Sequence, residues 1–251
     1  MAERSLVWFV SDVHLGLENP DPAEREARFL AFLKGIPRDS MALYLLGDIW
    51  DFWYEYRDVV PREGARVVAE LIALMDAGVQ VYFFPGNHDI WCFSFFESLG
   101  MIRCEQPQLV EIGGKIFCLG HGDGLGGAAF GARFLHAMFH GRLFQRMFST
   151  LHPWLAYRLG KGWSGSKREK HSRYKFRGEE EPLYKFALEQ SGQVHIDYFI
   201  FGHYHNAVDM VLPNGARLIV LEDWLRGGKP HAVFDAATGA FSYETCSSPL
   251  N

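Results

Sequence analysis

The chain has 251 residues, of which 48% are apolar, and this suits one sizeable buried core in a single α/β domain. Its net charge of −5 argues against a general polyanion-binding protein, so we expect no nucleic-acid partner. No apolar run reaches the ~18 residues that cross a bilayer, and the first residues show no signal-peptide pattern. The four cysteines lack the spacing of a disulfide framework, which fits a reducing compartment, and we expect a cytoplasmic protein.

The first half of the chain alternates predicted strands and helices. Residues 6–11 are β-rich and continuously apolar, as expected for a strand that is covered on both faces. Asp21-Pro22-Ala23-Glu24 then predicts the start of a helix, with an N-cap, a proline in the first turn and a capping carboxylate. The next predicted elements are a strand at 42–46, a helix at 61–77 that Gly78 ends, a strand at 79–85, and paired strands at 108–112 and 115–119 around Gly113-Gly114.

Residues 126–162 are rich in phenylalanine and leucine. At 100° per residue, the apolar side chains before Gly141 and those after it face nearly opposite directions, which predicts two short helices broken at His140-Gly141. A basic stretch follows over 158–177, and the last predicted strands are 197–201, 208–212, 217–221, 231–234 and 241–243. We therefore predict one domain, in which residues 1–125 and 178–251 form an α/β core and residues 126–177 form an inserted helical lid with a basic stretch.

Five short polar motifs each follow a predicted strand. Because the functional cleft of an open α/β sheet lies outside the carboxyl ends of its strands, we expect these motifs to meet in space. Residues two apart along a strand point the same way, so Asp12 and His14 should reach one cation, and so should His203 and His205. The motifs are Asp12-Val13-His14, Gly47-Asp48, Gly86-Asn87-His88-Asp89, Gly120-His121-Gly122-Asp123 and Gly202-His203-Tyr204-His205.

The side chains of these motifs suit a pair of divalent cations. The candidate ligands among them are two carboxylates, one amide and four imidazoles, with no thiolate, a set that favours Mn²⁺-like ions while remaining compatible with Zn²⁺ and Fe²⁺. Two ions ~3.5–4 Å apart lower the pKa of a shared water and clamp the attacking and leaving oxygens of a phosphate. Asp48 is the natural bridge, and two carboxylates against two divalent cations leave a positive surplus that suits an anionic substrate. The motifs therefore predict a two-metal phosphoester hydrolase.

The order of the motifs resembles that of the calcineurin-like metallophosphoesterases over about residues 5–235. The resemblance implies a four-layer αββα sandwich, with a catalytic role for His88 in stabilising charge near the scissile phosphorus. It also implies that Asp51 and Asp89 orient the ligands. One cation would be held by Asp12, His14, Asp48 and His205, and the other by Asp48, Asn87, His121 and His203.

A narrower resemblance links the chain to the bacterial UDP-2,3-diacylglucosamine diphosphatases of lipid A synthesis, whose core carries a helical lid. It depends on Gly47–Trp53, His121–Gly126 and Ile196–His205. It implies water attack on the α-phosphate of an acylated UDP-sugar, giving UMP and 2,3-diacylglucosamine 1-phosphate. It further implies peripheral association with the cytoplasmic face of the inner membrane and no required protein partner. Substrate contacts are expected from His88, Ser166, Lys167, Lys170 and His203; many members have arginine at the position of His88.

Two alternatives remain open at this stage. One is a general phosphodiesterase or phosphatase acting on nucleotides or phosphoproteins, although an open site of that kind has no need of a phenylalanine-rich cover. The other is a non-catalytic scaffold of the same fold, because a fold does not determine a function. Such scaffolds usually lose metal ligands, whereas all seven expected ligand positions are filled here.

Overall fold

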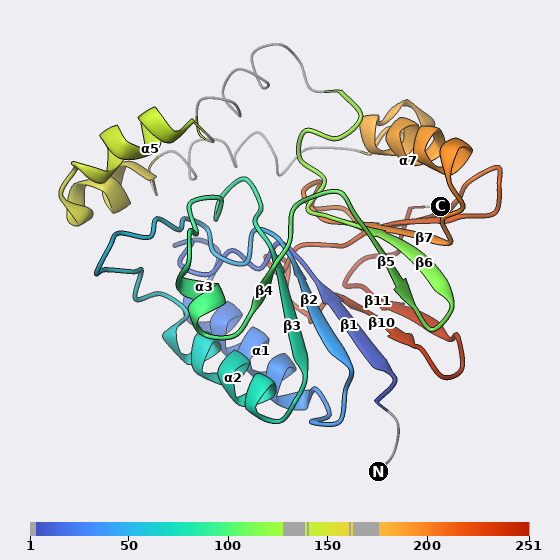
Figure 1. Ribbon diagram of the computed structural model, residues 1–251, viewed down its shortest axis with the longest axis horizontal. Coiled ribbons are helices and arrows are strands. Elements are labelled where there is room, and N and C mark those ends of the chain that lie inside the picture. Colours follow the sequence, from blue (N-terminus) through green and yellow to red (C-terminus); the bar gives the residue numbers. More distant parts are fainter. Residues whose placement is uncertain (1–3, 128–138, 140, 161, 163–175, 251) are drawn as a thin grey trace.

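Two mixed β-sheets form the centre of the protein in the computed structural model, which describes residues 4–127, 139, 141–160, 162 and 176–250 (Figure 1). The first sheet contains β1 (Leu6–Val10), β2 (Ala42–Leu46), β3 (Gln80–Phe84), β4 (Ile102–Arg103), β10 (His231–Asp235) and β11 (Phe241–Glu244). The second contains β5 (Gln108–Ile112), β6 (Lys115–Leu119), β7 (Tyr198–Phe201), β8 (Val208–Val211) and β9 (Arg217–Val220). Their orders are β11-β10-β1-β2-β3-β4 and β5-β6-β7-β9-β8.

The direction of the strands brings many carboxyl ends to one side. In the first sheet β1 to β4 run parallel, and β10 pairs with β1 antiparallel. In the second sheet β6, β7 and β9 run parallel, while β5 and β8 are antiparallel to their neighbours.

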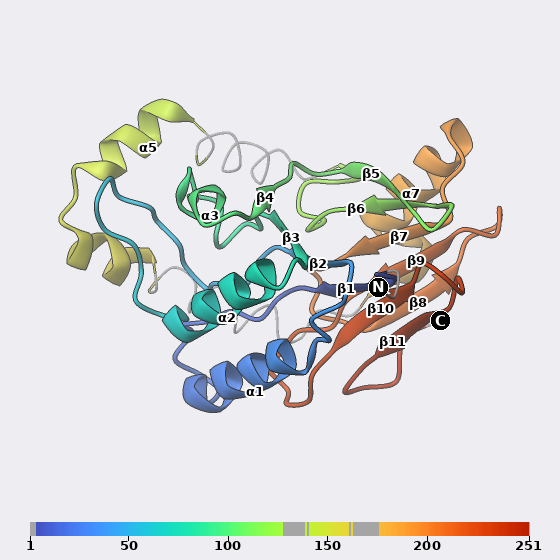
Figure 2. The ribbon, with the colours of Figure 1, turned by 60° about the horizontal axis from the view of Figure 1, so that its bottom comes forward.

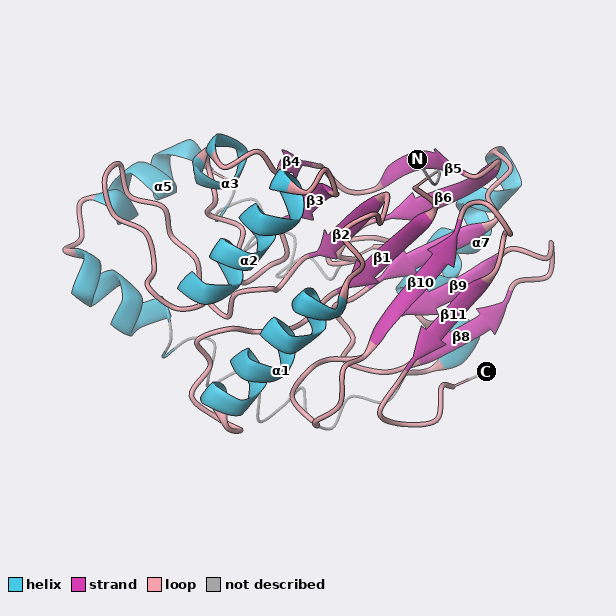
Figure 3. Ribbon diagram, turned by 90° about the horizontal axis from the view of Figure 1, so that it is seen from below, coloured by secondary structure: helices cyan, strands magenta, loops and turns pink. Residues whose placement is uncertain are grey.

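Helices cover the outer face of each sheet. Three helices lie against the first sheet: α1 (Pro22–Gly35), α2 (Ala65–Asp76) and α3 (Phe95–Ser98) (Figure 2, Figure 3). The helix α7 (Pro182–Gln193) lies against the second sheet, and the short 3₁₀ helix η1 (Gly178–Glu180) precedes it in the chain. The Asp21 side chain accepts a hydrogen bond from the Glu24 backbone N–H, as the predicted N-cap requires.

Side chains that alternate along the strands divide the buried residues into separate layers. On β2, Leu43 and Leu45 pack toward α1 and α2, whereas Tyr44 and Leu46 pack toward the second sheet. On β7, Phe199 packs with side chains of α7. The order helix, sheet, sheet, helix confirms the predicted four-layer αββα class.

Two helices of the core differ from the sequence prediction. The helix α2 begins at Ala65 rather than at residue 61, because Gly64 has a left-handed φ of 75° and serves as its N-cap. The helix α7 was not predicted at all. Its buried side chains, Leu183, Tyr184 and Ala187, make too narrow a stripe to produce a strong helical period in the sequence.

The described part of the insertion contains α5 (Arg142–Ser149) and a further helix at 153–160. Gly141 is the N-cap of α5, so the predicted break at this glycine is present. A second break, before Pro153, was not predicted. The helix predicted before Gly141 and most of the basic stretch lie outside the described residues.

Hydrogen bonds attach the insertion to loops that follow β2 and β3. The Tyr54 hydroxyl donates to Gln145 O at 2.8 Å, and the Tyr157 hydroxyl donates to Tyr54 O at 2.8 Å. The Trp91 indole N–H donates to Phe139 O at 2.9 Å. These loops also carry predicted site residues, so the insertion is attached beside the polar motifs.

The four cysteines are free thiols, and Cys92, Cys104 and Cys118 are buried. No helix in the described part of the chain combines the length and apolar character needed to cross a bilayer.

Candidate metal centre

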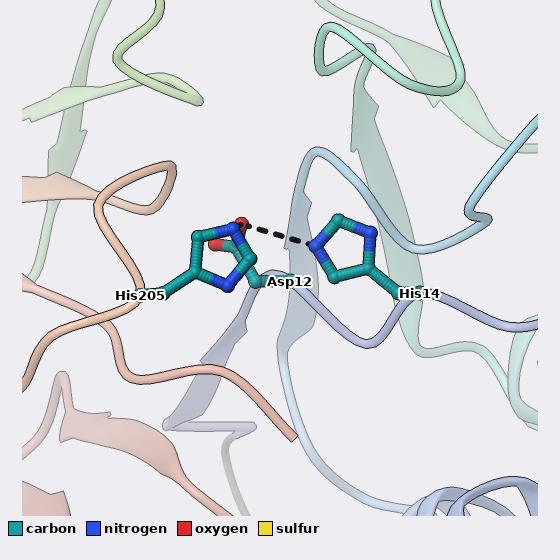
Figure 4. A group of neighbouring side chains, drawn as sticks. All are labelled: Asp12, His14 and His205. Carbon is teal, nitrogen blue, oxygen red and sulfur yellow. Dashed lines mark ion pairs between the residues drawn. The ribbon is translucent and has the colours of Figure 1, made fainter. Parts of the chain in front are cut away.

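The five motifs meet where the parallel strands of both sheets end. Asp12 and His14 follow β1, Asp48 follows β2, and the remaining motifs follow β3, β6 and β7. Asp12 Oδ1 lies 3.7 Å from His14 Nε2 and 3.6 Å from His205 Nε2. Figure 4 shows both imidazoles beside this carboxylate, although they come from opposite sheets. The two sheets therefore build one half of the centre together.

Asp48 joins this half to a second group of donors. Its Oδ2 lies 3.9 Å from His14 Nε2 and 3.4 Å from His121 Nε2, so the carboxylate faces both imidazoles. Asn87 Oδ1 lies 3.3 Å from His121 Nε2, and the ring of His203 is centred 5.2 Å from that of His121. The structure thus brings the seven predicted ligands into one cluster, with Asp48 at the position expected of a bridge.

The donor set fits a cation. Asp12 is fully buried, and its Oδ2 accepts hydrogen bonds from Ser11 Oγ at 2.6 Å and from the His203 backbone N–H at 2.9 Å. Among the described residues, none donates a hydrogen bond to Oδ1 of the same carboxylate. A buried carboxylate oxygen without such a donor is costly unless a cation compensates it. Since two imidazole nitrogens lie 3.6–3.7 Å from this oxygen, a divalent ion among the three atoms is the natural compensation.

The electric field of the cluster favours positive charge. Burial disfavours a charged imidazole, but the carboxylate of Asp48 outweighs burial and holds the pKa of His121 well above its usual value. Burial likewise opposes ionisation of Asp48, but His121 and His88 outweigh it, so the pKa of Asp48 is lowered. Burial, reinforced by His121, lowers the pKa of His203 to about 3. An imidazole binds a metal through the lone pair of its neutral form, so a bound cation would take the place of the proton that Asp48 favours on His121.

The left-handed backbone conformation of the ligand residues, rather than strand alternation, directs their side chains toward the cluster. The strands β1 and β7 end at Val10 and Phe201, before the ligands begin, so strand alternation was the wrong reason for pairing Asp12 with His14. The prediction from the same alternation that His203 and His205 reach one cation is wrong, because His205 lies beside Asp12 and His203 beside His121. Left-handed conformations are uncommon for residues with side chains and cluster at functional sites. They occur here at five proposed ligands: Asp12 (φ 53°), His14 (φ 54°), Asp48 (φ 53°), His203 (φ 72°) and His205 (φ 54°).

Glycines in the motifs allow close approach of the backbone. A Cβ at Gly86 would collide with Oδ1 of Asp48, and a Cβ at Gly202 would collide with Ser11 and with Oδ2 of Asp12. Each glycine belongs to one motif and contacts a carboxylate of another. The Gly-Asn-His and Gly-His-x-His patterns are therefore requirements of packing as well as of chemistry.

The two predicted orienting carboxylates have different positions. Asp51 Oδ1 lies 3.4 Å from His14 Nδ1, the ring nitrogen that faces away from Asp12 and Asp48, as expected of a group that orients the imidazole. Asp89 contacts backbone instead. It accepts hydrogen bonds from the backbone N–H groups of Asp48, Ile49, Trp50 and Gly86 at 2.7–3.2 Å, and so holds the turn that carries Asp48. Burial, followed by Asp48, raises the pKa of Asp89 to about 7.

His88 lies beside the cluster with one ring nitrogen already engaged. Its Nδ1 is 2.9 Å from Asp51 O, which turns Nε2 toward Asp48 Oδ2 at 4.0 Å. Its backbone N–H donates to Asp48 Oδ1 at 2.8 Å. The His88 side chain is 17% exposed, so it forms part of the accessible wall of the site.

The carboxylate of Asp223 belongs to the site, although it was not predicted from the sequence. This buried carboxylate lies 3.0 Å from His205 Nδ1, and it follows β9, the third parallel strand of the second sheet. Its place after a strand was the available signal, but no glycine or histidine accompanies it. The carboxylates of Asp51 and Asp223 lie next to the imidazoles of His14 and His205. The net positive charge of a site with two bound cations would therefore be smaller than that predicted from Asp12 and Asp48 alone. Ser166, Lys167 and Lys170 lie outside the described residues.

Comparison with known proteins identifies the family. A UDP-2,3-diacylglucosamine hydrolase of Porphyromonas gingivalis is 36% identical over 252 residues, covering 94% of this chain and 96% of the relative. A protein of the same name from Klebsiella pneumoniae is 30% identical and covers 86% of this chain and 90% of its own. Among solved structures, a dimetal phosphatase from Danio rerio is 15% identical, covers 93% of both chains and has a TM-score of 0.48.

Residues 5–207 match the calcineurin-like phosphoesterases, and this range contains every proposed metal ligand. The buried aspartate and histidine groups supply the metal-binding side chains that such chemistry needs. The chain therefore belongs to the calcineurin-like phosphoesterase family and is a metal-dependent phosphoester hydrolase.

Proposed function

We propose that this protein hydrolyses the diphosphate bond of UDP-2,3-diacylglucosamine and releases UMP and 2,3-diacylglucosamine 1-phosphate (lipid X). The supporting observation is 36% identity along 94% of the chain, insertion included, to a protein named for hydrolysis of this substrate. The site agrees with it, because a diphosphate is an anionic substrate that a pair of divalent cations can bind and polarise.

The proposed ligands hold two cations, for which we propose Mn²⁺. Asp12, His14 and His205 would hold one, Asn87, His121 and His203 would hold the other, and Asp48 would serve both. When bound, two such ions would activate a water and neutralise charge on the phosphate oxygens. His88 is held by Asp51 O so that Nε2 faces the site, where it can donate a hydrogen bond to a phosphate oxygen as charge develops.

The insertion, residues 126–177, acts in this proposal as a lid for the acyl chains. Its described helices carry large exposed apolar side chains: Leu143 is 74% exposed, Met147 63% and Trp154 63%. The basic stretch that follows suits the phosphates, with Ser166, Lys167 and Lys170, together with His203, as proposed substrate contacts. An open-sited phosphatase has no evident use for such a cover.

The same helices suit a membrane surface at the cytoplasmic face of the inner membrane. Between Asp123 and Glu169 the sequence has seven Lys or Arg and no acidic residue, although the whole chain carries −5. Exposed apolar side chains beside Arg146 and Arg158 match the composition of helices that lie in an anionic lipid interface. We propose that the lid lets the enzyme take its lipid substrate from that surface without a protein partner.

Substitution of the apolar face of α5 tests the membrane proposal. Leu143 and Met147 are four residues apart and share one helix face, so changing both to serine should lower co-sedimentation with phosphatidylglycerol-containing vesicles by about tenfold or more. A matched control changes two exposed residues of the α7 region, Leu188 within the helix and Val194 at its C-cap, to serine. The helix α7 lies at the opposite end of the molecule from α5 (Figure 1). Equal co-sedimentation of both double variants would contradict the proposal.

Product analysis tests the substrate and the bond cleaved. Incubation with UDP-2,3-diacylglucosamine, Mn²⁺ and ¹⁸O-labelled water should give UMP and lipid X in equal amounts, with the label in UMP. Hydrolysis of bis(p-nitrophenyl) phosphate without release of UMP would support a general phosphodiesterase instead. Failure to hydrolyse either compound, together with failure to bind metal, would support the scaffold.

A further inference from the structure

The loop after β9 contacts the metal centre at two points. Because β9 lies between β7 and β8 in the sheet, this loop leaves the sheet beside the motif that carries His203 and His205. Its three consecutive residues Glu222, Asp223 and Trp224 are all buried. Each of them contacts a different part of the protein.

Asp223 determines which nitrogen of His205 faces the site. Its Oδ2 lies 3.0 Å from His205 Nδ1, and its Oδ1 accepts a hydrogen bond from the Leu225 backbone N–H at 2.9 Å. A carboxylate can only accept, so the proton of this contact belongs to Nδ1. The lone pair of His205 is then on Nε2, which lies 3.6 Å from Asp12 Oδ1.

Trp224 fixes the other ligand of the same half. Its backbone N–H donates to Asp12 O at 3.1 Å, and its ring packs against Phe29 and Phe32 of α1, with centroids 5.1 and 5.4 Å away. The loop therefore joins Asp12, from the first sheet, to His205, from the second.

Glu222 anchors the loop to the C-terminal segment. Its carboxylate accepts hydrogen bonds from the Cys246 backbone N–H at 2.7 Å and from Ser247 Oγ at 2.6 Å. Its own backbone N–H donates to the Tyr243 hydroxyl at 2.8 Å. With both neighbours of Asp223 held in this way, the carboxylate has little freedom to leave His205.

We propose that Asp223 is a positioning residue of the metal centre, which fixes the tautomer and ring plane of His205 and thereby strengthens binding of the ion at Asp12, His14 and His205. The other half of the centre has a separate support, because His121 Nδ1 contacts Leu46 O at 2.9 Å. Loss of Asp223 should therefore weaken one ion and leave the second. This inference rests on the ligand roles proposed above but not on the identity of the substrate.

Metal titration of two variants tests the inference. In Asp223→Asn the side-chain amide has only one acceptor oxygen. If this oxygen accepts from the Leu225 backbone N–H, the NH₂ group faces His205 Nδ1 and cannot accept its proton. The tautomer of His205 is then no longer fixed. The metal-free protein is titrated with Mn²⁺, and free Mn²⁺ is measured by electron paramagnetic resonance. Compared with the wild type, the variant should bind one of its two Mn²⁺ equivalents about 10- to 100-fold more weakly. Asp223→Ala should show at least the same loss.

Two controls separate positioning from damage to the fold. Asp209→Asn removes a carboxylate from the neighbouring strand β8, where it pairs with Arg217 and not with a proposed ligand, and should bind both equivalents normally. In Zn²⁺-loaded protein, ¹⁵N spectra of the imidazoles should show a proton on His205 Nδ1 in the wild type and its loss or exchange in Asp223→Asn. The inference is overturned if the Asp223→Asn isotherm matches that of Asp209→Asn, or if both equivalents weaken together. None of these outcomes depends on whether UMP is formed.

Discussion

Replacing Asp48 with asparagine is expected to remove at least one of two bound ions and to lower phosphodiesterase turnover by about 10³-fold or more. The reason is its position: Oδ2 faces both His14 and His121, at 3.9 and 3.4 Å, and a neutral amide has no anionic oxygen for two cations to share. Metal ions supply several kcal/mol of transition-state stabilisation, and each 1.4 kcal/mol corresponds to about a tenfold change in rate.

The asparagine preserves the shape of the site, so the loss can be assigned to charge. Its side-chain oxygen can still accept from the His88 backbone N–H, as Asp48 Oδ1 does at 2.8 Å. Asp58→Asn, an exposed carboxylate in the loop after β2, is the matched control. Metal content by mass spectrometry and hydrolysis of bis(p-nitrophenyl) phosphate give the result, and two ions with full turnover in Asp48→Asn would refute the bridging role.

Replacing His88 with alanine is expected to keep both ions and to lower kcat by about 10²- to 10⁴-fold, the usual range for a positioned proton donor or acceptor. His88 Nδ1 is engaged by Asp51 O, and only Nε2 is turned toward the cluster, 4.0 Å from Asp48 Oδ2. This geometry suits a hydrogen bond to the substrate. His88→Gln, which retains an N–H donor, should recover part of the rate.

The same variants distinguish a catalytic His88 from a ligand. His14, Asp51 and His88 also approach one another closely enough to hold an ion, so a ligand role for His88 makes a clear alternative prediction. Metal analysis of dialysed His88→Ala decides between them. Loss of one ion would show that His88 is a ligand, whereas two retained ions with slow turnover would place it in the chemistry.

Much of the core could be predicted because its signals are local. The strand β2 is buried along its whole length and appears in the sequence as the continuous apolar run Ala42–Leu46. The turn Gly113-Gly114 fixes the pair β5 and β6, and Asp21 with Pro22 fixes the start of α1. Each of these depends on a few adjacent residues, and each prediction was confirmed.

The remaining features depend on contacts between distant segments. Left-handed φ at Asp12 and His205 has no signature in their own sequence, because the tertiary contacts that hold it come from other strands. Asp223 is 18 residues from His205 and belongs to no recognisable motif. The helix α7 has a weak periodic pattern because it buries only a narrow stripe. Such features follow from the assembled sheets and not from local composition.

The most direct measurement is a crystal structure of the protein grown with Mn²⁺, with anomalous scattering recorded to locate the ions. We expect two peaks ~3.5–4 Å apart, one among Asp12, His14 and His205, the other among Asn87, His121 and His203, with Asp48 in contact with both. No peak in this cluster at excess Mn²⁺, or a single peak held by His14, Asp51 and His88, would contradict it.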